Sequence, residues 1–205
     1  ARAIAMDPDY NLNLILGLFL WDFFAESTRA GLGSLQAKGF LVTRASFPRW
    51  VVVVTSTSNA VITLMLFAVL VCLWIACFER PLGPLELLCF AAYLVAFLAV
   101  VVGFALAASV LYLRYRDLNQ VWDMVLQAGF FVAPVISPLH IIPDRVHLLL
   151  HAWLPTPVIE FSRAVLVRGE IPSARGHLLL AAAALVTLGA GALVYRGLAP
   201  AAVEE

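Results

Sequence analysis

The fold class is decided by the stretch WVVVVTSTSNAVITLMLFAVLVCLWIACF, residues 50–78, which carries no charged side chain over its whole length. As an α-helix rising about 1.5 Å per residue, this stretch would be roughly 40 Å long. A bilayer core is about 30 Å thick, so a tilted helix of this length can cross it. Residues 87–113 form a second uncharged run of similar length. Both runs predict membrane-spanning helices.

The composition favours the same class of protein. Hydrophobic residues make up 63% of the 205 residues and charged residues only 13%, against about 25% charged residues in soluble domains. The 13 basic and 13 acidic side chains cancel, which argues against a basic nucleic-acid-binding protein. Such high hydrophobicity also excludes a disordered chain. Cys72, Cys77 and Cys89 lie in or beside apolar runs without metal-ligand spacing. An all-α integral membrane protein is therefore predicted.

Outward from residues 50–78, the sequence predicts five crossings. The first is a mixed helix interrupted by Asp22, Glu26 and Arg29, and the fourth contains two prolines. The five predicted spans cover residues 12–35, 50–78, 87–113, 118–142 and 177–195.

A proline-rich stretch, residues 143–176, separates the fourth and fifth predicted spans. It contains two apolar helical segments, residues 146–154 and 158–167, which are too short to cross a bilayer. We predict that these segments either lie at the membrane surface or re-enter the membrane from outside.

Basic residues in short loops predict the orientation of the spans. The loop after the first span carries Lys38, Arg44 and Arg49, and the loop after the third carries Arg114 and Arg116. Both loops are predicted to lie in the cytoplasm, with the N-terminal residues outside and the C-terminal residues inside. Because the sequence starts outside without a signal peptide, we expect a preceding cytoplasmic segment and one further span in the complete subunit.

Small residues follow one side of the third and fifth predicted spans. The positions are Ala91, Ala99, Gly103 and Ala107 in the third span and Ala183, Thr187 and Gly191 in the fifth. A spacing of four or eight residues lets another helix approach closely. This packing can join two subunits or two helices of one chain, and the sequence leaves both alternatives open.

Charges and prolines inside the first and fourth spans also have two interpretations. Asp22, Glu26 and Arg29 share one side of a helix, where Glu26 and Arg29 can pair or the charges can face water. Pro134 and Pro138 interrupt helical hydrogen bonding. They mark either a gated pathway or a kink near the membrane surface.

Aromatic side chains gather in the first and fourth spans and in the stretch before the fifth. They are Phe19, Trp21, Phe23, Phe24, Phe130, Phe131 and Trp153. Flat aromatic faces can stack against the C–H surfaces of sugars. They can also form an interfacial belt or contact lipid.

No catalytic motif is visible in the sequence. It has no GxxxxGK[ST], GxSxG or GxGxxG run. His147 and His151 are four residues apart, but Leu148 stands where a zinc-binding HExxH helix has Glu, so no metal site is predicted. We expect no bound cofactor and no reaction catalysed by this chain itself.

Three segments carry a family resemblance. The first is LGLFLWDFFAESTRAG, residues 16–31, followed by a basic loop, residues 37–50, that contains Phe-Pro-Arg. The second is LYLRYRDLNQVWDMVLQAGFFVAPVISPLHIIPDR, residues 111–145, and the third is LPTPVIEFSRAVLVRGEIP, residues 154–172. Together they resemble the LPWxFFSEAL, FRDL…FFxSPVIYP and NPLTxxIExFRxxLL patterns of ABC-2 type export permeases, in the polysaccharide and teichoic-acid branch. Asp22, Ala133 and Leu154 depart from the usual Asn, Ser and Asn.

The resemblance implies half of a transporter in the bacterial cytoplasmic membrane. Two copies of a six-span subunit would form the channel for a lipid-linked polysaccharide such as O-antigen or teichoic acid. Two copies of a separate subunit, which binds ATP and Mg, would dock on the cytoplasmic side. The loop of residues 37–50 would couple the two subunits through Lys38, Arg44, Phe47, Pro48 and Arg49.

The resemblance also implies a gate and a channel lining. Residues 143–176 would form the external gate, with Pro143, Trp153, Glu160 and Arg163 as its candidate residues. The implied channel-lining candidates are Trp21, Phe23, Phe24, Phe130, Phe131, Pro134 and Pro138.

Three other functions fit parts of the same pattern. A drug or lipid exporter of the same superfamily would share the topology, although the sugar-branch motifs argue against it. A membrane transferase would need an acidic or His-rich cytoplasmic loop, which is not visible here. A channel or scaffold would work without an ATP-binding partner.

Overall fold

The computed structural model describes residues 10–37, 48–135 and 153–198, and every regular element in these ranges is helical. The long helices are α1 (Tyr10–Ala37), α4 (Ser58–Trp74), α5 (Pro84–Arg114), α6 (Leu118–Val132) and α9 (Ala174–Leu198). The short ones are α3 (Arg49–Ser56), which leads into α4, and α8 (Pro155–Arg163). Two π-helical turns continue helices, η2 (Ile75–Glu79) after α4 and η4 (Ala164–Arg168) after α8. The predicted all-α class is confirmed.

Within the described residues, three helical segments are long and apolar enough to cross a membrane: Arg49–Glu79, Pro84–Arg114 and Ala174–Leu198. They correspond to the second, third and fifth predicted spans. Helix α1 has 28 residues but contains Asp22, Glu26 and Arg29, and it does not meet the same criterion. Helix α6 has 15 residues, about 22 Å, which is less than the thickness of a bilayer core. Length and composition therefore mark three of the five predicted spans.

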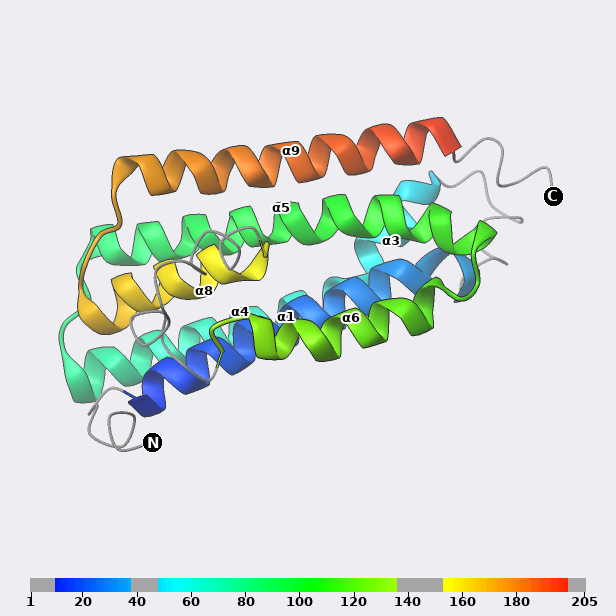
Figure 1. Cartoon of the computed structure of the whole chain (residues 1–205). Helices are drawn as coiled ribbons and strands as arrows, with labels where there is room; N and C mark the ends of the chain where they lie inside the picture. Colours follow the sequence, from blue (N-terminus) through cyan, green and yellow to red (C-terminus); the bar gives the residue numbers. More distant parts are fainter. Residues whose placement is uncertain (1–9, 38–47, 136–152, 199–205) are drawn as a thin grey trace.

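The connections between helices sort to two opposite ends of the bundle (Figure 1). The end of α1, the start of α3, the α5–α6 connection and the end of α9 lie together. The α4–α5 connection and the connection from η4 to α9 lie at the opposite end. Arg49, Arg114, Arg116 and Arg196 are therefore on one side, in agreement with the sidedness that their distribution predicts.

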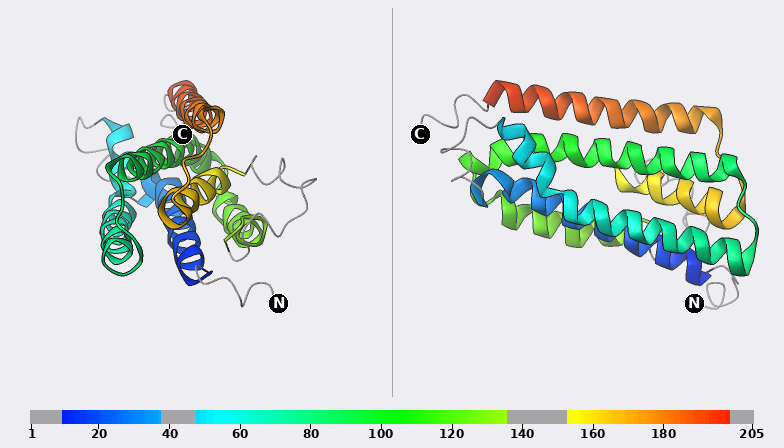
Figure 2. Two further views of the ribbon diagram at one scale, coloured as in Figure 1. Left: turned by 90° about the vertical axis from the view of Figure 1, so that its left-hand side faces the viewer. Right: turned by 180° about the vertical axis from the view of Figure 1, so that it is seen from behind.

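Helices α6 and α8 each occupy only part of the length of the bundle. Helix α6 starts at the end where α5 finishes and stops near the middle, whereas α8 starts near the middle and continues toward the opposite end (Figures 1 and 2). Val158 and Ile159 of α8 are completely buried. Helix α8 is therefore packed inside the bundle, and its assignment as a re-entrant or interfacial segment stays a prediction. The other segment of the predicted pair, residues 146–154, lies almost entirely outside the described residues.

The close packing of α5 against α9 explains the role of two of the small residues. A Cβ atom added to Gly103 would lie 2.5 Å from the carbonyl oxygen of Thr187, and one added to Gly191 would overlap the Gly103 backbone. Backbone contact this close requires glycine on both helices. Gly103 and Gly191 therefore pack helices within one chain, and the alternative of a subunit interface is wrong at these positions.

The core between the helices is largely aromatic and aliphatic. The rings of Phe24 on α1 and Phe97 on α5 stack at 5.9 Å with an angle of 3°. Leu16 and Leu20 of α1 are completely buried beside them. Gly31 of α1 lets the Ala105 side of α5 approach its backbone. Helix α1 is thus fixed along one side, and its opposite side is left exposed.

Candidate functional site

The exposed side of α1 carries the charged residues Asp22, Glu26 and Arg29. The Arg29 Nε–H donates to Asp123 Oδ1 on α6 at 2.6 Å, and about half of the Arg29 side chain is exposed. The pair that the sequence suggests between Glu26 and Arg29 is not formed, because the guanidinium turns to α6 instead. Sequence spacing shows only neighbours on the same helix, so it missed Asp123.

A second contact ties α6 to α1 beside this ion pair. The Trp122 Nε1–H donates to the hydroxyl of Thr28 at 3.0 Å, and that hydroxyl donates to the Phe24 carbonyl at 2.7 Å. The Trp122 ring also stacks on Phe104 of α5 at 4.2 Å. One ionic and one neutral hydrogen bond therefore join α1 and α6 in the half of the bundle that holds the basic ends.

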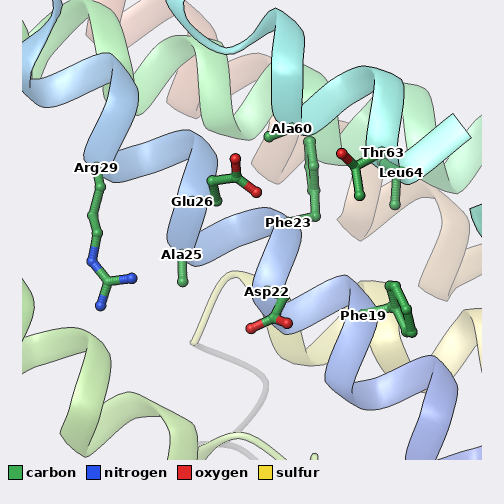
Figure 3. Close-up of a pocket in the computed structure, with 9 residues that line it drawn as sticks. All are labelled: Phe19, Asp22, Phe23, Ala25, Glu26, Arg29, Ala60, Thr63 and Leu64. Carbon is green, nitrogen blue, oxygen red and sulfur yellow. The ribbon is translucent and has the colours of Figure 1, made fainter.

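A pocket of about 290 Å³ lies between the exposed side of α1 and helix α4 (Figure 3). Glu26 points toward the side where α1 faces α4, and Arg29 points away from it. Two acidic side chains, one hydroxyl and two aromatic rings thus contribute to the wall of one cavity. The lining residues are Phe19, Asp22, Phe23, Ala25, Glu26, Arg29, Ala60, Thr63 and Leu64.

A buried arginine in α8 joins three parts of the chain. Arg163 is only 1% exposed. Its Nε–H and Nη2–H donate to the carbonyl of Asn13 at 2.9 and 2.7 Å, and Nη2–H also donates to Val135 at 2.7 Å. Its Nη1–H groups donate to the carbonyl of Pro134 at 2.5 Å and to Glu160 Oε1 at 3.1 Å. Because guanidinium has five N–H groups, Arg163 is fully satisfied, and it ties α8 to α1 and to the end of α6.

This arginine clamp depends on a glycine in α1. A Cβ atom added to Gly17 would overlap the Arg163 guanidinium and lie 2.9 Å from the Val135 carbonyl oxygen. Glycine is therefore required where the two chain segments meet the α1 backbone. Arg163 and Glu160 belong to a matched motif, but no motif pointed to Gly17 or Asn13, since the contacts are made to backbone atoms.

A second arginine contacts η4, the helical turn that continues α8. Arg80 follows η2, and its Nη1–H donates to both carboxylate oxygens of Glu86, at 2.8 and 3.0 Å. Its Nη2–H donates to the carbonyls of Val165, at 2.8 Å, and Leu166, at 3.4 Å, in η4. Glu86 also accepts the Gly83 N–H at the start of α5. The α4–α5 connection and η4 are thus joined through one guanidinium, a link that the sequence did not indicate.

The predicted channel-lining residues differ in how far they are buried. Trp21, Phe23 and Phe24 are at most 5% exposed and pack inside the bundle, whereas Phe131 is 81% exposed. Pro134 is buried just after α6 ends, with its carbonyl on Arg163. Of the rest, Phe130 contacts Trp21 edge to face, and Pro138 lies outside the described residues. Their role in lining a channel stays a prediction.

The predicted gate residues are partly described. Trp153 lies against Trp21, with ring centroids 6.4 Å apart. Glu160 and Arg163 form the buried pair described above, and Pro143 lies outside the described residues. Their function as a gate also stays a prediction.

The described coupling residues, Pro48 and Arg49, lie at the end of the bundle that also carries Arg114, Arg116 and Arg196. Pro48 is exposed, and its carbonyl accepts the Val51 N–H at 3.0 Å in the first turn of α3, which starts at Arg49. Lys38, Arg44 and Phe47 lie outside the described residues. Their coupling role stays a prediction as well.

Metal ligands do not gather in the described part of the chain: it contains no group of three or more His, Cys, Asp or Glu residues that could hold an ion. His147 and His151, whose spacing raised the question, lie outside this part.

Known relatives were found by sequence comparison, although no family model matches the chain. The chain is 27% identical over 194 residues to the O-antigen export system permease protein RfbA of Myxococcus xanthus, which covers 92% of this chain and 73% of that protein. Two RfbA proteins of Klebsiella pneumoniae are 28% and 24% identical, each over 67% of this chain and 53% of their own length. The chain thus spans about half the length of the Klebsiella relatives. These alignments show that the chain is similar to O-antigen export system permease proteins, and together with its long apolar helices they support a multi-pass membrane protein.

Proposed function

We propose that this chain is the permease subunit of an ATP-driven exporter that moves a lipid-linked polysaccharide of the O-antigen kind across the bacterial cytoplasmic membrane. The observation that carries the proposal is the alignment with the Myxococcus xanthus O-antigen export permease over 92% of the chain. The exposed charges of α1 support it, because charged side chains in a membrane bundle mark paths for hydrophilic cargo.

The proposed complex contains two copies of the permease and two copies of a separate ATP-binding subunit, which binds and hydrolyses ATP. The ATP-binding subunits would dock at the end that carries Arg49, Arg114 and Arg116. Basic side chains there suit an acidic cleft on the partner. Residues 37–50 would transmit closure of the ATP-binding subunits to α1 and α3, which they connect.

Co-expression with candidate ATP-binding subunits of ABC exporters from the same genome tests this function. We expect the two proteins to co-purify and the pair to restore surface polysaccharide in a strain lacking its own exporter. Export without any ATP-binding partner would contradict the proposal.

Neutralising the basic loop tests the coupling step. Replacement of Lys38, Arg44 and Arg49 by Gln is expected to reduce co-purification and polysaccharide export about tenfold or more, through lost charge complementarity. Arg168→Gln and Arg175→Gln, at the opposite end of the bundle, form the control. Full coupling in the loop variant would show that the coupling assignment is wrong.

A further inference from the structure

The pocket between α1 and α4 has polar groups that make no polar contacts with other described residues of the chain. We propose that it is a binding subsite for a neutral sugar ring of the exported glycan. This inference rests on the proposed function, because it names the part of the cargo that one site recognises.

The first argument is the state of the two carboxylates. Asp22 and Glu26 are exposed, and neither has a hydrogen-bond or ion-pair partner among the residues that the structure describes. The nearby cation, Arg29, is already engaged by Asp123 on α6. Unpaired charges in the middle of a membrane helix are costly, so they need water or a ligand that donates hydrogen bonds.

The second argument concerns the kind of ligand. A carboxylate accepts short, charge-assisted hydrogen bonds from hydroxyl groups, and a sugar ring offers several hydroxyls as donors. Two carboxylates beside one another repel a phosphate or diphosphate. The site therefore selects the uncharged glycan and not the phosphate of its lipid carrier.

The third argument is the apolar wall of the pocket. The ring of Phe19 stacks on Phe67 of α4 at 3.7 Å with an angle of 9° and is still 40% exposed. Such a fixed aromatic ring can receive the C–H surface of a sugar. Across the pocket, the Thr63 hydroxyl donates to the Asn59 carbonyl at 3.1 Å, which leaves its oxygen free to accept a hydrogen bond from a ligand.

Size and position complete the argument. A volume of about 290 Å³ is close to the lower limit of about 300 Å³ for small-molecule pockets, which suits one ring of a chain in passage. The α1 residues that line the pocket, Phe19 to Arg29, belong to the middle turns of that helix (Figure 3). A glycan crossing beside α1 would pass it.

Saturation-transfer difference NMR tests the subsite on the permease with its ATP-binding partner in nanodiscs. The probes are the neutral trisaccharides of glucose, galactose, mannose and rhamnose at millimolar concentration. We expect saturation of ring protons of at least one probe. The double variant Asp22→Asn/Glu26→Gln should bind that probe about tenfold more weakly, because charge-assisted hydrogen bonds become neutral ones.

Two further variants separate the sugar site from a general disturbance. Phe19→Ala should lose the signal, whereas Phe19→Tyr, which keeps a ring, should retain it. Leu66→Ala, on a part of α4 that is 62% exposed and outside the pocket, should bind as the original protein does.

The following results would overturn the inference. The first is that no probe is saturated, and the second is that the double variant is saturated as strongly as the original protein. The third is a magnesium-dependent thermal shift that the original protein shows and the double variant loses. The fourth is the loss of dimers in the double variant. The last two would identify a cation site or a contact between copies. If the double variant still exports polysaccharide normally and no sugar binds, the subsite is wrong while the exporter assignment stands. Absence of export by the original protein would instead refute the function.

Discussion

Hydrogen bonds offset the energetic cost of burying the charged side chain of Arg163. An unpaired guanidinium in the interior would destabilise the fold by several kcal/mol. Here Glu160 supplies one negative partner, and the carbonyls of Asn13, Pro134 and Val135 accept the remaining N–H groups. The carbonyls of Pro134 and Val135 follow the end of α6 and have no helical N–H partner. Arg163 supplies their hydrogen-bond donors, and they in turn supply acceptors for the guanidinium.

Removing this side chain should have a large effect. Arg163→Gln leaves Glu160 unpaired and several carbonyls without donors, and we expect the free energy of unfolding to fall by about 3–5 kcal/mol. Thermal unfolding in detergent measures it. The control is Arg168→Gln, whose pair with Glu170 is long, 3.6 Å, and exposed, and is therefore worth less than about 1 kcal/mol. Equal stability of the two variants would refute the clamp.

Gly17 and Gly33 lie on the same helix and should respond to the same substitution with opposite sign. Gly17→Ala forces Arg163 and Val135 away from α1, and overpacking of this kind costs about 1–3 kcal/mol. A Cβ atom at Gly33 meets nothing within 4 Å, so Gly33→Ala should stabilise α1 by up to about 1 kcal/mol. Unfolding curves of the two variants side by side check this. A stabilised Gly17→Ala variant would contradict the close approach.

Functional residues that belong to sequence motifs could be predicted from the sequence. Residues whose role is to contact backbone atoms could not. Glu160 and Arg163 were found because they match a family pattern. Gly17 and Arg80 were not, since their partners are backbone atoms or side chains far apart in the chain, and no spacing rule reports them. The same limit explains why Arg29 was paired with Glu26 and not with Asp123.

Among the elements, α5 and α9 make the closest contact. We expect Gly191→Val to push α9 away from the Gly103 backbone, because no rotamer change can relieve a clash with main-chain atoms. The unfolding free energy should fall by about 1–3 kcal/mol, and limited proteolysis should cut before α9 at lower protease concentration. Gly189→Val, on the same helix with open space around it, is the matched control and should change neither measurement.

The helices differ in how well hydropathy predicts them. The spans that contain α4, α5 and α9 are long apolar runs, and the sequence identified them directly. Hydropathy does not predict α6 and α8 correctly, because each helix covers only part of the length of the bundle. Packing against other helices and the contacts of Arg163 stabilise them. Hydropathy therefore counted residues 118–142 as a crossing, whereas the described helix ends at Val132.

For the whole molecule, the arrangement of the ends predicts which residues are reachable from each side. With Cys72, Cys77 and Cys89 replaced by Ser, we expect Glu170→Cys to react with a membrane-impermeant maleimide in intact cells. Arg116→Cys, at the opposite end of the bundle (Figure 1), should react only after permeabilisation. The reverse pattern would invert the orientation, and labelling of both variants from one side would contradict the arrangement of the bundle.

The two π-helical turns next to Arg80 affect how the helices that they belong to can rotate. Each turn bonds at a wider interval than an α-helix, as in the bond from the Arg80 N–H to the Ile75 carbonyl at 2.9 Å, so each accommodates an extra residue. A return to α-helical bonding would rotate everything beyond the turn by about 100°. Arg80 follows η2 and donates to two carbonyls of η4. Rewinding of either turn would therefore require that these hydrogen bonds break, so the guanidinium links the conformations of the two turns.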